Sequence, residues 1–136
     1  MSTANYFTIV DLLKSTTAER LKIINRPSDE VRKELEVTVC KLNFISVLAH
    51  AYGATIRVTS GYRCKELNAA VGGVRNSLHM YGQAVDFTVS DAEAKHKLHD
   101  ALKEDACLKL LGICELIEYP SFMHVGFMSI LMCGNK

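Results

Sequence analysis

Apolar residues in the first half of the chain recur at steps of three or four positions. The clearest stripe consists of Val31, Leu35, Val39, Leu42, Ile45 and Leu48, which is the spacing of a core-facing helix. Ser28 can cap the amino end of this helix, and two acids follow in the first turn, where the helix dipole favours them. Gly53 is a natural stop. The pattern therefore predicts one long helix between Ser28 and Gly53.

Shorter amphipathic segments predict four further helices. They are residues 9–13, opened by Thr8 and Asp11; a segment capped by Thr16 or Thr17 and running through Ile23; residues 64–71; and a helix that begins at the capping box of residues 90–93. The last of these would turn Ala94, Leu98, Ala101 and Leu102 inward. Helices thus dominate the first half of the chain and alternate with other elements in the second.

Four segments have the alternation or the β-branched content of strands: residues 55–60, 84–89, 113–118 and 123–127. In the second segment Ala84, Asp86 and Thr88 would share one face. The last two segments are separated only by residues 119–122, a tight connection. The sequence therefore predicts an α+β fold, with helices packed on a small, largely antiparallel sheet, in a single domain that spans residues 1–136.

Composition narrows the class of protein. The net charge of +1 gives no electrostatic reason to expect a nucleic acid or an anionic membrane as partner. No run approaches the roughly 20 apolar residues of a membrane span, and the amino end lacks a secretory signal. The five cysteines are scattered, without a Cys-x-x-Cys pair, which argues against a disulfide scaffold or a thiolate zinc site. We expect a protein that is cytoplasmic as synthesised and that can act on a cell wall after release.

Candidate chemistry is concentrated in three residues. His79 and Asp86 lie within residues 77–86, and His124 lies in the apolar stretch 122–127. Two imidazoles and one carboxylate leave one position of a tetrahedral zinc open for water, as in catalytic rather than structural sites. A lone histidine on a strand is usually an ordinary core or surface residue, so the prediction depends on the combination. An unpaired carboxylate at Asp86, in the middle of a strand, would be costly to bury. The set predicts a metallohydrolase.

The motifs around these residues resemble those of the zinc D-alanyl-D-alanine carboxypeptidase family, which includes cell-wall carboxypeptidases, phage endolysins and vancomycin-resistance dipeptidases. The matching segments are Ser60-Gly61-Tyr62-Arg63, Leu67-Asn68 with Val71-Gly72-Gly73-Val74, Ser77-x-His79, Gly82-x-Ala84-x-Asp86 and the strand of His124. Residues 77–91 also resemble the zinc site of the hedgehog signalling domain, which shares the fold. The resemblance runs from about Tyr6 to Phe127. It implies one zinc ion per chain, bound by His79, Asp86 and His124.

The resemblance also implies a general base. Many members of the family carry a glutamate three residues before the second histidine, but this position is Ser121 here. Glu118 lies six residues before His124, a spacing that the hedgehog domain shares. We therefore expect the hairpin to bring Glu118 to the attacking water, with Glu115 as the fallback. The alternative is a solvated carboxylate at the end of a strand.

Two further residues are candidates for substrate binding. Arg63 resembles the family arginine that clamps a substrate carboxylate or a developing oxyanion, for which its fork of donors is suited; an exposed arginine is otherwise a surface residue. Ser77 would hydrogen-bond substrate or hold its own loop in place. The remaining histidines, His50, His96 and His99, have helical contexts and are expected to be ordinary surface or core residues.

The function implied is hydrolysis of amide bonds in peptidoglycan peptides that contain D-alanine, by a D-Ala-D-Ala carboxypeptidase or a cell-wall endopeptidase. Glu118 would take the proton of the attacking water, while Arg63 would stabilise the oxyanion. We expect a monomer whose partners are peptidoglycan stem peptides or their precursors. Three alternatives remain: a non-catalytic zinc-dependent binding module of the same fold, a cytosolic D-Ala-D-Ala dipeptidase, and a non-haem iron enzyme with a two-histidine, one-carboxylate face. The seven-residue gap between His79 and Asp86 weakens the last.

Overall fold

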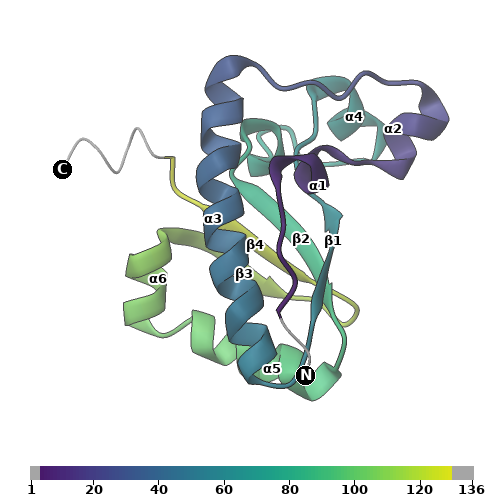
Figure 1. The fold of residues 1–136 in the computed structure, drawn as a ribbon. Helices are drawn as coiled ribbons and strands as arrows, with labels where there is room; N and C mark the ends of the chain where they lie inside the picture. Colours follow the sequence, from purple (N-terminus) through teal and green to yellow (C-terminus); the bar gives the residue numbers. More distant parts are fainter. Residues whose placement is uncertain (1–3, 130–136) are drawn as a thin grey trace.

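A four-stranded antiparallel sheet forms the centre of the fold (Figure 1). The computed structural model describes residues 4–129. Within them the strands are β1 (Ile56–Ser60), β2 (Ala84–Val89), β3 (Ile113–Glu118) and β4 (Met123–Phe127), in the order β1-β2-β4-β3. Each neighbouring pair is antiparallel. The predicted α+β class, with helices packed on a small antiparallel sheet, is confirmed.

The helices connect and cover this sheet. They are α1 (Ile9–Leu13), α2 (Thr16–Leu21), α3 (Asp29–Ala51), α4 (Lys65–Ala70), the 3-10 helix η1 (Leu78–Tyr81), α5 (Ala92–Leu102) and α6 (Asp105–Leu111). The long helix α3 runs along the sheet for most of the length of the molecule (Figure 1). Within the described residues, no helix has the length and apolar content needed to cross a membrane.

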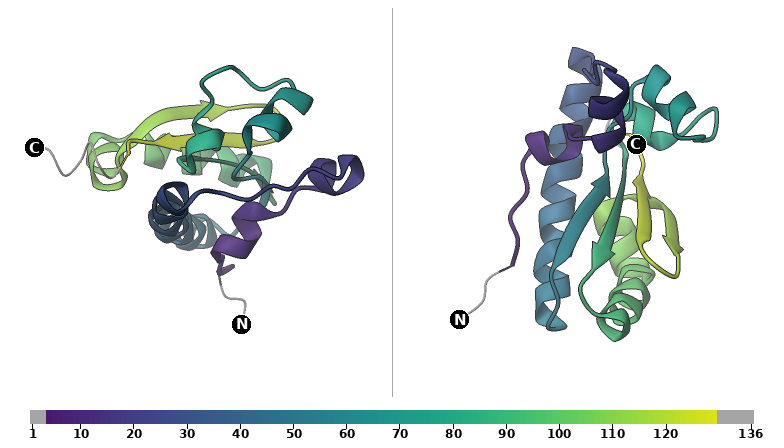
Figure 2. Two further views of the ribbon diagram at one scale, coloured as in Figure 1. Left: turned by 90° about the horizontal axis from the view of Figure 1, so that it is seen from above. Right: turned by 90° about the vertical axis from the view of Figure 1, so that its right-hand side faces the viewer.

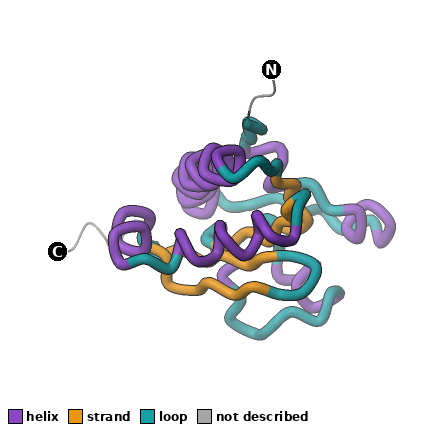
Figure 3. Tube along the Cα trace, turned by 90° about the horizontal axis from the view of Figure 1, so that it is seen from below, coloured by secondary structure: helices purple, strands orange, loops and turns teal. Residues whose placement is uncertain are grey.

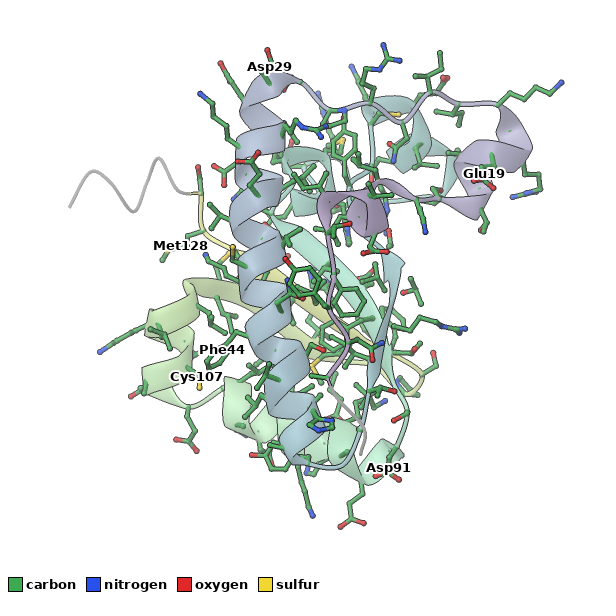
Figure 4. The ribbon with its side chains drawn as sticks, viewed as in Figure 1. Glu19, Asp29, Phe44, Asp91, Cys107 and Met128 are labelled. Atoms are coloured by element: carbon green, nitrogen blue, oxygen red, sulfur yellow. The ribbon has the colours of Figure 1, made fainter. Side chains whose placement is uncertain are left out.

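The helix boundaries follow local capping chemistry. Ser28 Oγ accepts a hydrogen bond from the backbone N–H of Val31 at 3.2 Å, and α3 begins at Asp29. The carboxylate of Asp91 accepts from the backbone N–H of Ala94 at 2.8 Å, and α5 begins one residue later. Figure 4 shows Asp29 and Asp91 at opposite ends of the molecule, where these two helices start. The predicted cap Ser28 is confirmed, because a cap depends only on residues within one turn. The predicted capping box of residues 90–93 is wrong by one residue: Asp91 caps α5, and the hydroxyl of Ser90 instead accepts a hydrogen bond from the backbone N–H of Thr55 at 2.9 Å.

Three local features differ from the sequence prediction. Helix α2 is capped by Ser15, whose Oγ accepts from the backbone N–H of Ala18 at 3.1 Å, rather than by a threonine. It ends at Leu21, since Lys22 takes a left-handed conformation with φ of 59°. Helices η1 and α6 lie in segments for which the pattern predicted no helix. Helix η1 is a short 3-10 helix, whose period differs from that of an α-helix, and α6 begins without a side-chain cap that would mark its start.

The core lies on one face of the sheet. Alternate residues of β2 and β4 meet the inner faces of α3 and α5, and the fully buried members of this cluster include Leu35, Leu42, Ile45, Val85, Phe87, Leu98, Leu102, Met123, Val125 and Phe127. Figure 2 shows α3 along the sheet in two further views, and Figure 3 shows helical segments on either side of the strands. Because successive residues of a strand point to opposite faces, the residues between these core positions face away from α3. Asp86 and His124 are two of them.

Candidate metal centre

Three side chains from separate elements converge on the face of the sheet opposite α3. Asp86 of β2 and His124 of β4 are direct cross-strand partners, and His79 comes from η1. Asp86 Oδ1 lies 2.7 Å from His124 Nδ1 and 3.3 Å from His79 Nε2. One ligand atom from each residue lies within 4.8 Å of the others, so the three could hold a metal ion. The structure thus brings together the residues singled out by the sequence.

His79 is held rigidly by its own backbone and by the loop after β1. Its ring is buried, with 3% of the residue exposed. Its Nδ1 lies 2.7 Å from the carbonyl oxygen of Gly61, which leaves Nε2 to face Asp86. The backbone N–H of His79 donates to Ser77 Oγ at 3.2 Å, so the Ser77 hydroxyl holds the turn that carries the imidazole. Of the two roles considered for Ser77, this contact supports the second.

His124 is held between two carboxylates. Its Nδ1 faces Asp86, and its Nε2 lies 2.7 Å from Glu115 Oε1. Glu115 belongs to β3, where its cross-strand partner is Gly126. From the sequence alone, Glu115 is expected only as the fallback base. The signal that could have identified it is the glycine opposite, which leaves room on that face for a long side chain.

The expectation that the hairpin brings Glu118 to the metal centre is wrong. Its carboxylate accepts a hydrogen bond from His96 Nδ1 at 3.2 Å and lies 3.8 Å from His99 Nδ1, both on α5. The cross-strand partner of His124 is Ile117, whereas that of Glu118 is the buried Met123. Because paired residues of an antiparallel sheet share a face, Glu118 points to the side of α5 and not to the site.

Arg63 brings a positive charge next to Asp86 at the cleft. Its Nε donates to Ser60 Oγ at 3.0 Å, and its Nη1 donates to Asn68 Oδ1 at 3.2 Å. Its Nη2 lies 3.6 Å from Asp86 Oδ2, the carboxylate oxygen that the histidines leave free. Burial lowers the pKa of Arg63 and the neighbouring Asp86 opposes this shift; a guanidinium nevertheless stays charged near neutral pH. The expected place of Arg63 at the site is confirmed.

Hydrogen bonds among these side chains shift the pKa values of both Asp86 and His124. Burial alone would raise the pKa of Asp86, but the hydrogen bonds from His124 and His79 outweigh it and hold the pKa far below its usual range. Burial alone would lower the pKa of His124, but the hydrogen bonds to Asp86 and Glu115 outweigh it and raise the pKa. A carboxylate that stays ionised in a partly buried position is suited to bind a cation.

The geometry fits a small divalent metal ion. Ligands of a tetrahedral zinc site lie about 3.3 Å apart, given metal–ligand bonds of about 2.0–2.2 Å. The separation of 3.3 Å between Asp86 Oδ1 and His79 Nε2 matches that value, the separation of 2.7 Å to His124 Nδ1 is shorter, and all three ligand atoms lie within 4.8 Å of one another. The second ring nitrogen of each histidine contacts an oxygen, from Gly61 for His79 and from Glu115 for His124. Metal-binding histidines usually have such a partner, which sets the ring orientation.

An open cleft of about 480 Å³ leads to the three residues. Arg63 and Glu115 line it, together with the loop of residues 72–74 and the turn between β3 and β4. The aromatic rings of Tyr119 and Phe122 stack on this turn, with centroids 4.5 Å apart. The site is therefore accessible to a ligand that is larger than water, with apolar side chains near a charged floor.

Comparisons with known proteins agree with this geometry. No protein of curated function matches the chain. A family model described as Peptidase M15 matches residues 5–126, a range that contains every side chain of the site. The match confirms the resemblance that the sequence motifs indicated and covers most of the 136 residues. The chain belongs to the peptidase M15 family.

Proposed function

We propose that this protein is a zinc-dependent peptidase that hydrolyses amide bonds in peptidoglycan peptides containing D-alanine. The observation that carries the proposal is the convergence of His79 Nε2, Asp86 Oδ1 and His124 Nδ1 at the floor of an open cleft, in a chain of a peptidase family. Two imidazoles and a carboxylate are a usual ligand set of catalytic zinc.

The spacing of the ligands in the sequence favours zinc over iron. Imidazole nitrogen binds zinc and iron alike, so the types of donor atom alone do not decide between the two metals. Iron sites with two histidines and a carboxylate usually join the first histidine and the acid over a much shorter interval than that between His79 and Asp86. When bound, zinc supplies Lewis acidity, which polarises a peptide carbonyl and makes water a better nucleophile near neutral pH.

Arg63 is suited to recognise the anionic part of the reaction. Ser60 and Asn68 each hold one of its nitrogens, so the guanidinium is fixed before substrate arrives. Such an arginine can pair with the terminal carboxylate of a substrate or with the oxyanion that develops at the scissile carbonyl. A carboxypeptidase or dipeptidase would use the first role, and an endopeptidase would use the second.

The walls of the cleft support a peptide with small apolar side chains. Val74, Ile117, Tyr119 and Phe122 line it and offer apolar surface, and 72% of Val74 is exposed to solvent. A volume of about 480 Å³ is enough for several residues of a short peptide. Peptidoglycan stem peptides that end in D-alanine have this chemistry, with methyl side chains next to a free carboxylate.

A second candidate is a non-catalytic zinc-binding module. It is favoured because, within the described residues, every carboxylate that lines the cleft already contacts His124. Glu118 faces α5, and Ser121 occupies the position where many relatives have a glutamate. The carboxylates that line the cleft within the described residues are those of Asp86 and Glu115, and each contacts His124. A chain that binds zinc but cleaves nothing would support this candidate.

The test combines metal analysis with digestion of defined peptides. The purified chain, His79→Gln and His96→Gln are compared for zinc content and for cleavage of muropeptides and of free D-Ala-D-Ala. His96 is the matched control, because it is an exposed imidazole outside the site. We expect one zinc per chain and cleavage in wild type and His96→Gln, and neither in His79→Gln. Zinc binding without cleavage of any substrate would refute the peptidase proposal, and cleavage of the dipeptide alone would restrict it to a dipeptidase.

A further inference from the structure

Glu115 contacts His124 on the ring nitrogen that faces away from the other two metal-binding candidates. Its Oε1 lies 2.7 Å from Nε2, whereas Nδ1 lies 2.7 Å from Asp86 Oδ1. A neutral imidazole carries its proton on one nitrogen only, and a metal ion needs the lone pair of the other. Because Nδ1 faces Asp86, metal binding there requires the proton to be on Nε2. An ionised Glu115 accepts that proton in a hydrogen bond and so favours the required tautomer.

The same geometry separates Glu115 from the place where a water would react. Nδ1 and Nε2 lie on different edges of the imidazole ring. The oxygen of Glu115 is on the Nε2 edge, while Asp86 and His79 converge on the Nδ1 edge. Glu115 therefore acts on the metal centre through His124, whereas a general base must reach the reacting water directly.

Gly126 provides the space for this contact. It is the cross-strand partner of Glu115. A Cβ atom at residue 126 would lie 2.7 Å from Glu115 Oε1 and 3.0 Å from Glu115 Cβ, and 2.9 Å from Leu78 Cδ1. Separations below about 3.5 Å between carbon atoms are repulsive. Any larger residue at position 126 would therefore push Glu115 away from His124.

We propose that Glu115 is a positioning residue of the metal centre, which orients His124 and holds its proton on Nε2, and that Gly126 is required for it to do so. This inference depends on the metal centre of the proposed function. It assigns Glu115 a role different from that of the general base, which would take a proton from the attacking water. Partners of metal-binding histidines typically change metal affinity by about 10–100-fold when they are removed.

The experiment measures zinc affinity of the full chain by competition with a chromogenic chelator. Glu115→Ala should lower the zinc affinity by about 10–100-fold. Glu115→Gln keeps an acceptor oxygen, so its zinc affinity should fall by a smaller factor. Glu118→Ala is the matched control: it removes a carboxylate from the same strand but from the opposite face, and its affinity should equal that of wild type. In the zinc-loaded chain, ¹⁵N-resolved NMR should show a hydrogen-bonded proton on His124 Nε2, which exchanges faster with solvent in Glu115→Ala.

Gly126→Ala tests the same contact from the other strand, so the inference can be checked even if Glu115→Ala does not fold. It should lower zinc affinity in the wild-type background and have no further effect in Glu115→Ala, because the two changes remove one interaction. Equal zinc affinity of wild type and Glu115→Ala, above all if hydrolysis is lost, would overturn the positioning role while the metal centre stands. Failure of wild type to bind zinc would overturn both.

Discussion

Replacement of Gly61 by alanine should damage both the stability of the chain and its metal centre. Gly61 follows β1 and packs against the backbone of α1. A Cβ atom built at this position would lie 2.7 Å from Leu12 Cα and 2.9 Å from the Leu12 carbonyl carbon. These are backbone atoms, so no side-chain rotation relieves the overlap. Tyr62, the next residue, donates its N–H to the Leu12 carbonyl at 2.7 Å, which keeps the two segments together.

The magnitude follows from these contacts. Overpacking in a close-packed region costs about 1–3 kcal/mol, and lengthening of the hydrogen bond to Leu12 adds about 1 kcal/mol. We expect Gly61→Ala to lower the free energy of unfolding by about 2–4 kcal/mol on these two counts. The carbonyl of Gly61 also accepts the hydrogen bond from His79 Nδ1. Its displacement should therefore reorient His79 and lower zinc affinity by about 10–100-fold.

Urea denaturation of the metal-free chain measures the first effect, and chelator competition measures the second. Gly53→Ala is the control. Gly53 has a φ of 82° and no atom within 4 Å of a built Cβ, so alanine there should cost about 1–2 kcal/mol of backbone strain. It follows α3 and is not among the described residues that line the cleft, so zinc affinity should not change. A Gly61→Ala chain with wild-type stability and wild-type zinc affinity would refute the reasoning.

Three further outcomes are expected. In the metal-free chain the free energy of unfolding should fall as the pH drops below about 4, because the pKa of Asp86 is depressed in the folded state and acid protonates the unfolded chain first. Asp86→Asn should flatten this part of a pH series of urea titrations. Lys95 is buried and donates from Nζ to the carbonyl oxygens of Tyr119 and Pro120. Lys95→Met leaves these acceptors without a donor and should lower the free energy of unfolding by about 1–3 kcal/mol in the same assay; an unchanged stability would contradict this. Zinc at a hundredfold excess over its dissociation constant should stabilise the chain by about 2.7 kcal/mol, an increment that a chelator removes and that His79→Gln should lack.

Most elements of the fold could be predicted because their signals are local. The helix that begins after Ser28 and the strand of Asp86 have boundaries that depend on caps, periodicity and glycines within a few residues. The two elements that the pattern did not predict are the 3-10 helix η1 and the helix α6, which begins without a side-chain cap. The predicted cap of α2, Thr16 or Thr17, lies one or two residues after the actual cap Ser15, because all three residue types are suitable caps.

The metal-binding candidates were also predictable, because two histidines and a mid-strand aspartate occur together with motifs that are specific to a family. The choice between Glu115 and Glu118 could not be predicted from the sequence. Both lie on β3, and both precede His124 by fewer than ten residues. Their roles depend on the face of the strand to which each side chain points.

The sequence by itself determined most of the secondary structure, the α+β class and the three residues that could bind a metal, because these follow from local periodicity and from side-chain chemistry. Only the tertiary structure decided which carboxylate joins them. The pairing of β3 with β4 places Ile117 opposite His124, so Glu118 points toward α5 while Glu115 points toward the cleft. A shift of one residue in this pairing would exchange the two faces. That register is a property of two strands in contact, and no pattern within either strand specifies it.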